Sequence, residues 1–462
     1  MTRVVVVGAG FTGLVAAYEL RKRLGETAQI VVADASDRIG GSVRPVQLGG
    51  ARFEAGAESF LANSPDILRL ADELGLAGRI VSSGPARPSV FAARETHPLP
   101  TGTYFGLPSP ETETALLGPE DLAAIREDRP ADWDTSTDMS IAELVEPVYG
   151  PAVRARLVDP LLSGVYAGDS FTIGVRAGLP ALAAKLDEEA GPGAKHVSLT
   201  RAVAAARSGA GTASGGAGTA PRRAASGGMF RSFDGGLGLL LDALLQAAGP
   251  LDLRLGEEVT RLERTSNGYA VDPVGEADAV VLAVGSHVAG ALLACVDEEA
   301  GRAAASIPTA SPVVLALRCE RLEVPDGTSG VLVASGEGLA AKALTLTANK
   351  WPHLSAPVLR VSFGRYGDDL SFTADEQLLA WAASDFTRIF GKRLAVTDWT
   401  VQRYPEALPQ YGPWHSRKVA AIASASAGGL AVAGNFLRGV GLGACAATAA
   451  AAAEQIANVL EG

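Results

Sequence analysis

A strand, glycine and helix motif at the start of the chain restricts its fold more than any other feature. Residues 4–7 are four valines, and such a β-branched run is typical of a buried parallel strand. The run continues into residues 8–13 (GAGFTG), where a helical pattern begins. In such a turn Gly8 permits the sharp bend, Gly10 lets a pyrophosphate approach, and Gly13 lets helix and strand pack closely. The chain is therefore predicted to begin with a dinucleotide-binding βαβ unit.

An acidic residue in the expected place supports this prediction. Dinucleotide sites of this type carry an acid about 20 residues after the glycines, where it holds a ribose hydroxyl. Asp34 stands there, at the end of a second apolar run over residues 30–33. The helix that follows the glycines offers free amide hydrogens and a positive dipole end to the phosphates. These features do not distinguish NAD from FAD.

A second glycine element follows Asp34. Residues 38–41 read Arg-Ile-Gly-Gly. An arginine can neutralise a pyrophosphate, and paired glycines let the backbone lie against a flat ring or a phosphate. An ordinary turn with a solvated arginine is the alternative interpretation. In residues 53–59, which come next, a glutamate could bind a ribose or be a structural acid.

A third glycine-rich segment lies near the other end of the chain. Residues 434–443 (GNFLRGVGLG) follow a predicted strand and precede a predicted helix. The amino end of that helix could lie at the pyrimidine edge of a flavin and stabilise negative charge there. The alternative is a loose turn before a packed helix. Two such devices in one chain favour an extended FAD that both ends hold.

Composition narrows the class of protein. The chain has 462 residues and a net charge of -11, which argues against a nucleic-acid binder. Its three cysteines are far apart, which argues against a disulfide framework or a zinc site. We therefore expect no metal and a cytoplasmic location. No signal peptide is recognised, and the two apolar stretches are interrupted, so no transmembrane segment is expected. Peripheral contact with a membrane is left open.

The order of elements predicts an α/β fold. It consists of a split Rossmann-like cofactor domain, a β-rich substrate domain and a helical insertion. An Ala/Gly/Ser/Arg tract is predicted to be a flexible low-complexity insertion, since it cannot bury enough apolar surface. The predicted segments are 1–78, 229–300 and 416–462 for the cofactor domain, 79–104 and 301–415 for the substrate domain, 105–202 for the helical insertion and 203–228 for the flexible tract.

Taken together, the three glycine elements resemble the FAD-dependent amine oxidase and protoporphyrinogen oxidase superfamily. Other stretches resemble its porphyrinogen oxidase branch, and the bacterial coproporphyrinogen-oxidising members in particular. These stretches are residues 54–61, 97–102, 163–169, 233–237, 349–353 and 407–411. The resemblance covers nearly the whole chain outside residues 203–228.

The resemblance implies noncovalent FAD and a set of residues that hold it. The adenosine and pyrophosphate side is expected at Gly8, Gly10, Gly13, Asp34, Arg38 and Gly41, with the backbone of Val259 at the adenine. The isoalloxazine and its phosphates are expected at Gly439, Val440 and Gly441. Further predicted contacts are Phe11, Thr12, Gly40, Ser42, Gly56, Ala57 and Gly434.

The chain departs from the family pattern at two positions. The family usually has glutamate at the ribose position, where this chain has Asp34, and the shorter acid can still accept the hydrogen bonds. An aspartate often precedes the late cysteine, where this chain has Ala444. Cys445 resembles a helix-packing residue, and the local pattern of a covalent flavin attachment is absent.

The resemblance also implies a reaction. It suggests oxidation of coproporphyrinogen III to coproporphyrin III in haem biosynthesis, with hydride passing from the substrate to the flavin. Oxygen would be the final acceptor and would leave as hydrogen peroxide. No side chain is assigned a catalytic role, because the flavin carries the chemistry. A protoporphyrinogen IX oxidase is the first alternative and another amine oxidase-like flavoenzyme the second; a noncatalytic dinucleotide-binding scaffold comes from a different class. A partner enzyme of the haem pathway is left open.

Four residues are candidates for the substrate pocket. Coproporphyrinogen carries four carboxylates, so an acidic protein must concentrate positive charge locally. Arg87 and Arg94, beside the turn at residues 97–100, and Lys350 are the candidate cations, with solvated surface charge as the alternative for each. Tyr166 is the candidate for a wall near the ring, with an ordinary core tyrosine as the alternative.

Overall fold

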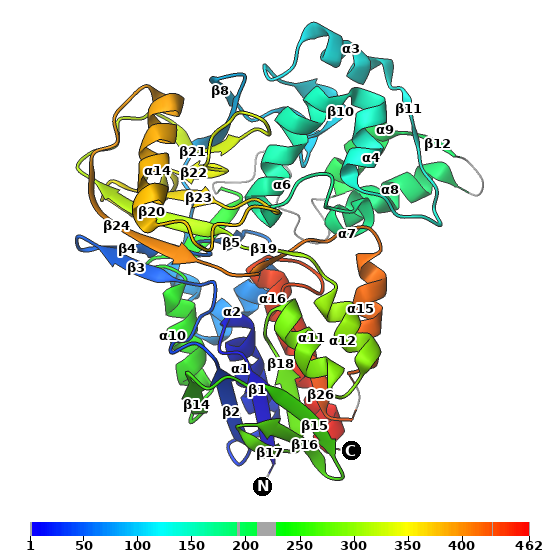
Figure 1. Cartoon of the computed structure of the whole chain (residues 1–462), viewed down its shortest axis with the longest axis vertical. Helices are drawn as coiled ribbons and strands as arrows, with labels where there is room; N and C mark the ends of the chain where they lie inside the picture. The colour runs from blue at the N-terminus through cyan, green and yellow to red at the C-terminus, as the bar shows by residue number, and fades with distance from the viewer. Residues whose placement is uncertain (1, 192–194, 210–227, 427, 462) are drawn as a thin grey trace.

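The computed structural model describes residues 2–191, 195–209, 228–426 and 428–461, and a five-stranded parallel sheet forms its lower half (Figure 1). The strands, in spatial order, are β14 (Asp252–Leu255), β2 (Gln29–Asp34), β1 (Arg3–Val7), β18 (Ala279–Leu282) and β26 (Leu430–Val432). All four neighbouring pairs are parallel. Strands from the beginning, middle and end of the chain therefore share one sheet, and the predicted split Rossmann-like fold is confirmed.

Both faces of this sheet are covered, as its apolar strands predict. Val4 and Val6 face one layer of helices, while Val5 and Val7 face the opposite layer. The first layer consists of α1 (Phe11–Leu24), α2 (Pro65–Glu73), α10 (Gly238–Ala247) and α16 (Leu442–Glu461). The second consists of the antiparallel strands β15 (Arg261–Thr265), β16 (Gly268–Asp272) and β17 (Gly275–Ala277), with α11 (Ser286–Ala294), α12 (Glu298–Ala305) and α15 (His415–Ser424).

A seven-stranded mixed sheet forms the upper left of the molecule in Figure 1. Its strands, in spatial order, are β24 (Val396–Arg403), β20 (Val313–Cys319), β23 (Val358–Phe363), β22 (Ala343–Thr345), β21 (Thr328–Val333), β7 (Arg87–Ala92) and β8 (Glu95–Pro98). Helix α14 (Asp375–Phe390) packs on one face through Leu378, Ala382 and Phe386. The opposite face is turned toward the cofactor-binding sheet, as the contacts of Arg360 described below show.

Helices form most of the upper right of the molecule (Figure 1). They are α3 (Pro119–Glu127), α4 (Ile141–Tyr149), α5 (Pro151–Val153), η2 (Arg154–Val158), α6 (Asp159–Tyr166), α7 (Val175–Gly178), α8 (Pro180–Ala190) and α9 (Leu199–Gly209). Two antiparallel strand pairs accompany them: β9 (Thr101–Tyr104) with β10 (Leu107–Glu113), and β11 (Pro130–Asp132) with β12 (His196–Ser198). These elements share one apolar core.

The prediction that the flexible tract starts at residue 203 is wrong. Residues 203–209 belong to α9, and Val203 and Ala206 are fully enclosed in the apolar core of the helical unit. The alanines there are helix formers, and the buried residues Leu199, Ala202, Val203 and Ala206 follow one another at helical spacing. The rest of the tract, residues 210–227, lies outside the described residues.

Short elements connect these units. They are β3 (Pro45–Leu48), β4 (Ala51–Glu54), β5 (Phe60–Leu61), η1 (Ala77–Arg79), β6 (Ile80–Ser82), β13 (Phe230–Phe233), β19 (Thr309–Ala310), α13 (Thr347–Lys350) and β25 (Leu408–Pro409). Among the described residues, no helix is both long and apolar enough to cross a bilayer. The other limits of the predicted segments stay predictions.

Candidate active site

The first glycine loop has the geometry that its sequence predicts. Gly8 has a φ of +109°, and its amide donates to the carbonyl of Ala33 at 2.7 Å, which ties the loop to the end of β2. A Cβ on Gly13 would lie 1.8 Å from the carbonyl oxygen of Gly8. Gly13 is therefore required by the packing of α1 against β1.

Gly10 is different, because none of the described residues lies close enough to require glycine there. Its φ is -68°, and a Cβ there would meet only backbone atoms of Gly41, the nearest at 3.8 Å. The space beside Gly10 lies at the amino end of α1, where free amides and the helix dipole favour an anion. This cradle fits a pyrophosphate.

Asp34 lies beside the same loop at the end of β2. Its carboxylate accepts from the amide of Ala9 at 2.6 Å and from the amide of Ser36 at 2.7 Å. A carboxylate has about four lone-pair sites, so oxygens remain to accept a ribose hydroxyl. The backbone of Asp34 also accepts from the amide of Glu257, which brings the segment that contains Val259 next to this acid.

Arg38 lies in the second glycine element without an acidic partner. Its guanidinium donates only to backbone, to Gly41 O at 2.9 Å and to Ile39 O at 3.1 Å. Burial, helped by the nearby charge of Arg44, lowers its pKa. Within the part of the chain that the structure describes, this cation makes no ion pair, so it is free to bind a phosphate. The backbone of Gly40 and Gly10 form a β-bridge that holds the two loops together.

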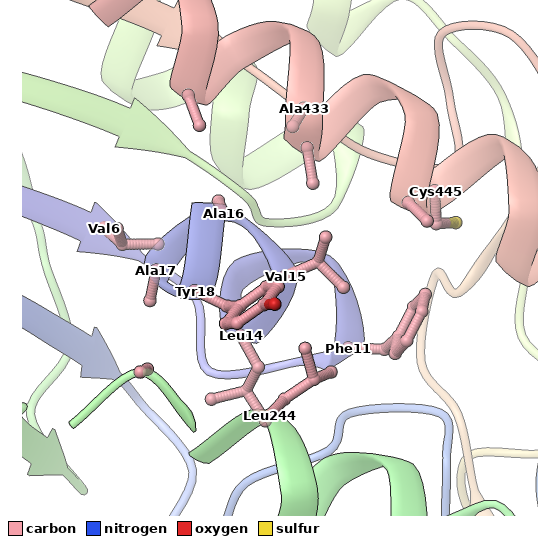
Figure 2. Close-up of a cluster of buried hydrophobic side chains, with 14 of the residues drawn as sticks. Val6, Phe11, Leu14, Val15, Ala16, Ala17, Tyr18, Leu244, Ala433 and Cys445 are labelled. Carbon is pink, nitrogen blue, oxygen red and sulfur yellow. The ribbon is translucent and has the colours of Figure 1, made fainter. Parts of the chain in front are cut away.

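The late glycine segment meets the first one. Cys445, in the first turn of α16, lies against Phe11 of α1 (Figure 2), and its thiol lies near Thr12. Burial raises the pKa of Cys445 to about 11, so this residue packs as an inert thiol. Gly441 has no atom within 4 Å of an added Cβ. The amino ends of α1 and α16 therefore approach each other, although their residues lie more than 400 positions apart in the sequence.

The comparisons with known proteins decide the family. A family model for flavin-containing amine oxidoreductases matches residues 11–457. The chain belongs to this family. Coproporphyrinogen III oxidases of Mycobacterium tuberculosis and Mycobacterium bovis are each 40% identical to it, over 99% of this chain and 97% of their own length. The coproporphyrinogen III oxidase of Bacillus subtilis is 26% identical, over 96% of this chain and 95% of its own.

Solved structures agree with this family. A structure from Exiguobacterium sp. 255-15, which carries protoporphyrinogen oxidase as a provisional name, matches with a TM-score of 0.84 at 25% identity. It covers 100% of this chain and 99% of that chain. Cyclohexylamine oxidase from Brevibacterium oxydans shares the fold, with a TM-score of 0.71 at 16% identity over the full length of both chains. This flavoprotein is thus an oxidase, and FAD is its cofactor. The residues assigned to FAD from the sequence stay predictions.

Tyr404 lies beside the predicted flavin contacts, and sequence reasoning missed it. Its hydroxyl is buried and has no hydrogen-bond partner among the described residues. Burial raises the pKa of Tyr404 to about 12, and its charged neighbours include Arg38 and Arg44. A Cβ on Gly56 would lie 2.7 Å from this hydroxyl and 1.9 Å from the carbonyl of Ser42. Tyr404 lies about 350 residues from these glycine segments, so no local pattern could reveal it.

Tyr166 lies at the end of α6, buried against another tyrosine. Its ring centroid is 5.7 Å from that of Tyr411, which in turn stacks on His415 at 4.3 Å. The hydroxyl of Tyr411 donates to the carbonyl of Asn435 in the late glycine segment. Val440 of that segment packs against the same core. Tyr166 is therefore connected to the predicted flavin loop through Tyr411.

Lys350 does not offer a free charge. Its ammonium lies 2.5 Å from Glu58, which also pairs with Arg360 at 3.1 Å. Despite its burial, Glu58 has a pKa lowered to about 2 by these two cations. Lys350 is thus neither a solvated surface charge nor an unpaired cation. Glu54, the other glutamate of residues 53–59, accepts from the amide of Gly238 at the start of α10. Its role, ribose binding or structural, stays a prediction.

The two candidate arginines of the substrate pocket do not come together. Arg87 begins β7, while Arg94 lies in the turn after its far end, a separation of roughly 17 Å or more along a strand. Both side chains are exposed, and no hydrogen bond or ion pair engages either guanidinium within the described residues. The expectation that both lie beside the turn at residues 97–100 is wrong for Arg94, because the strand carries it to the opposite end of the hairpin.

Proposed function

We propose that this flavoprotein oxidises coproporphyrinogen III to coproporphyrin III in haem biosynthesis, with oxygen as the acceptor and hydrogen peroxide as the second product. The observation that carries this proposal is the 40% identity to mycobacterial coproporphyrinogen III oxidases over almost the full length of both chains. The meeting of the two glycine segments at one site supports it, because an extended FAD needs both.

The chain's own residues have binding and positioning roles in this proposal. The amides at the start of α1 and the guanidinium of Arg38 hold the pyrophosphate, and Asp34 accepts from the ribose. Tyr404 donates its free hydroxyl to the cofactor. Bound FAD supplies the hydride acceptor. The reaction needs little acid–base help from the protein, because a porphyrinogen is electron-rich and gains aromaticity on oxidation.

Noncovalent attachment of the flavin is part of the proposal. Cys445 is the cysteine nearest to the predicted flavin loop, and its thiol is buried between α1 and α16 with a raised pKa. Such a thiol is a poor nucleophile. Denaturation in acid is expected to release all of the flavin into the supernatant. Yellow colour that stays with the precipitated protein would contradict this part.

A direct comparison of two substrates tests the function. The purified holoenzyme is offered coproporphyrinogen III and protoporphyrinogen IX separately, and porphyrin fluorescence and peroxide are followed. We expect a higher kcat/KM for coproporphyrinogen III, with peroxide formed in step with porphyrin. A preference for protoporphyrinogen IX would favour the alternative, which the 25% identical structure from Exiguobacterium supports. Oxidation of neither would refute both.

A further inference from the structure

A lysine in the substrate-domain sheet is buried without a partner. The side chain of Lys342 belongs to a residue that is only 6% exposed. No hydrogen bond or ion pair joins its ammonium to any residue that the structure describes. A buried ammonium normally pairs with an acid or coordinates a ligand, because its desolvation is costly.

A β-bulge decides which way Lys342 points. The amide of Lys342 donates to the carbonyl of Ser362 at 2.8 Å, although the register places Ala343 opposite Ser362. Two residues of one strand thus oppose one residue of its neighbour, and such a bulge re-aims a side chain. Ala341 and Leu344, on either side of the bulge, both lie in the core under α14. Lys342 therefore shares the opposite face of the sheet with Ala343.

That opposite face is turned toward the cofactor domain. Arg360, on the neighbouring strand β23, lies on the same face, since Leu359 and Val361 point to the α14 core. Arg360 donates to the carbonyl of Gly56 at 2.5 Å and pairs with Glu58. Gly56 belongs to the predicted flavin contacts. The face that carries Lys342 therefore reaches the flavin-binding segment.

The end of helix α6 borders the same region. The amide of Tyr366, in the loop after β23, donates to the carbonyl of Ala167 at 2.6 Å. Ala167 follows Tyr166, the candidate wall of the substrate pocket. In the same loop, Arg365 lies near Lys342, and its guanidinium donates only to the carbonyl of Ala341, at 3.2 Å.

The positive charges around Lys342 are not balanced by a paired acid among the described residues. Arg365 is the largest charged influence on it and is repulsive, while Asp368 is attractive and exposed. Burial, with Arg365, lowers the pKa of Lys342 to about 7. Asp368 and Asp385 also attract the guanidinium of Arg365. Neither acid lies within ion-pair distance of Lys342 or Arg365. Two neighbouring cations without a paired acid form an incomplete site that one carboxylate would complete.

We propose that Lys342 binds a carboxylate side chain of the substrate. This inference rests on the proposed function, because it assigns one acidic arm of a tetracarboxylate porphyrinogen to this position. Arg365 adds positive charge beside that arm. Lys342 is thus a specificity-determining residue that the sequence pattern does not mark.

Kinetics with two forms of the substrate test this proposal. Lys342→Met keeps the length of the side chain and removes its charge. We expect KM for coproporphyrinogen III to rise about tenfold or more, as for the loss of a charge-assisted hydrogen bond, with kcat changed less than twofold. For the tetramethyl ester, which has no carboxylate, KM should be the same in variant and wild type. Lys392→Met, an exposed lysine of the same domain, is the matched control.

Folding is checked separately from recognition. FAD content should be unchanged, and the melting temperature should stay or rise, because the variant removes an uncompensated buried charge. A merely structural lysine would lower the melting temperature and raise KM equally for acid and ester, which would overturn the proposal. Unchanged KM for the acid would overturn it too. If Lys342→Met does not fold, Lys342→Gln is measured in the same way.

A binding measurement keeps this test independent of turnover. Quenching of porphyrin fluorescence reports binding of coproporphyrin III and of its tetramethyl ester to the holoenzyme. Lys342→Met should weaken binding of the acid about tenfold and leave binding of the ester unchanged. The wild type could bind coproporphyrin III and its ester but oxidise neither coproporphyrinogen III nor protoporphyrinogen IX. The proposed function would then fail, and the binding measurement would still decide the role of Lys342.

Discussion

The glycines of the first glycine loop are required for different physical reasons. Gly13 has no room for a side chain, because the carbonyl of Gly8 lies 1.8 Å from where its Cβ would be. Gly10 has room within the protein, and only a ligand would fill that room. The same motif thus combines one residue that the fold needs with one that is predicted to be needed for the cofactor.

Two valine substitutions should separate these roles. Gly10→Val should fold with a melting temperature close to that of the wild-type apoprotein but purify without FAD, because the branched side chain occupies pyrophosphate space. Gly13→Val should lose more than about 3 kcal/mol of stability by overpacking. Flavin absorbance and thermal unfolding measure the two effects. A Gly10→Val protein with full flavin content would contradict the assignment.

The buried acid Glu58 makes stability depend on pH. Its pKa is lowered from an ordinary 4.5 to about 2 by Arg360 and Lys350. An acid with a lowered pKa stabilises the fold above its unfolded pKa, and this contribution is lost as the pH falls from about 4.5 to about 2. The difference corresponds to roughly 3 kcal/mol.

Urea unfolding of wild type and Glu58→Gln between pH 7 and pH 3 measures this contribution. The wild type should lose stability on acidification by more than the variant does, and Lys350→Met should show an intermediate dependence because Arg360 still pairs with Glu58. Identical pH profiles for wild type and Glu58→Gln would show that the cluster contributes nothing.

Elements were predicted well where their pattern is local. The valine strand, the glycine turn and the helix after it follow from residues that are neighbours in sequence, and the structure confirms the fold that they imply. The end of α9 was missed because an alanine-rich sequence has little periodicity of its own. The ion cluster at Glu58, the hydroxyl of Tyr404 and the bulge at Lys342 depend on contacts across about 20 to 360 residues, which no local pattern contains.

Two aspartate substitutions test whether the residues around 203 belong to helix α9. Val203 is enclosed in the helical core, whereas Ala205, two residues later, is exposed. Val203→Asp should destabilise the protein by more than about 3 kcal/mol, because it buries an unpaired charge, and Ala205→Asp should change stability by less than about 1 kcal/mol. Chemical denaturation measures both. Equal small effects would mean that this segment does not pack as a helix.

At the scale of the whole molecule, the predicted cofactor site joins parts of the chain that are far apart in sequence. The predicted FAD contacts come from the first, middle and last strands of one sheet. A ligand that binds only the folded state stabilises it by about 2.7 kcal/mol at 100 times its dissociation constant. Removal of FAD should therefore lower the melting temperature of this sheet as one unit.

Calorimetry of holo- and apoprotein measures this effect, and re-addition of FAD is the control. The transition that contains the parallel sheet should move down on removal and return on addition. Limited proteolysis of the apoprotein should become faster both near the first glycine loop and near α16. Faster cleavage at only one of these ends would contradict a cofactor held by both.

The position of β26 and α16 in the sheet also determines when the protein can become active. A ribosome makes β1 and its glycine loop first, but the partner loop and the helix that meets Thr12 are made after every other strand of that sheet. A nascent chain therefore presents half of a flavin cradle throughout most of its synthesis. If both glycine segments hold FAD as predicted, complete capture of the cofactor has to wait until α16 has been made.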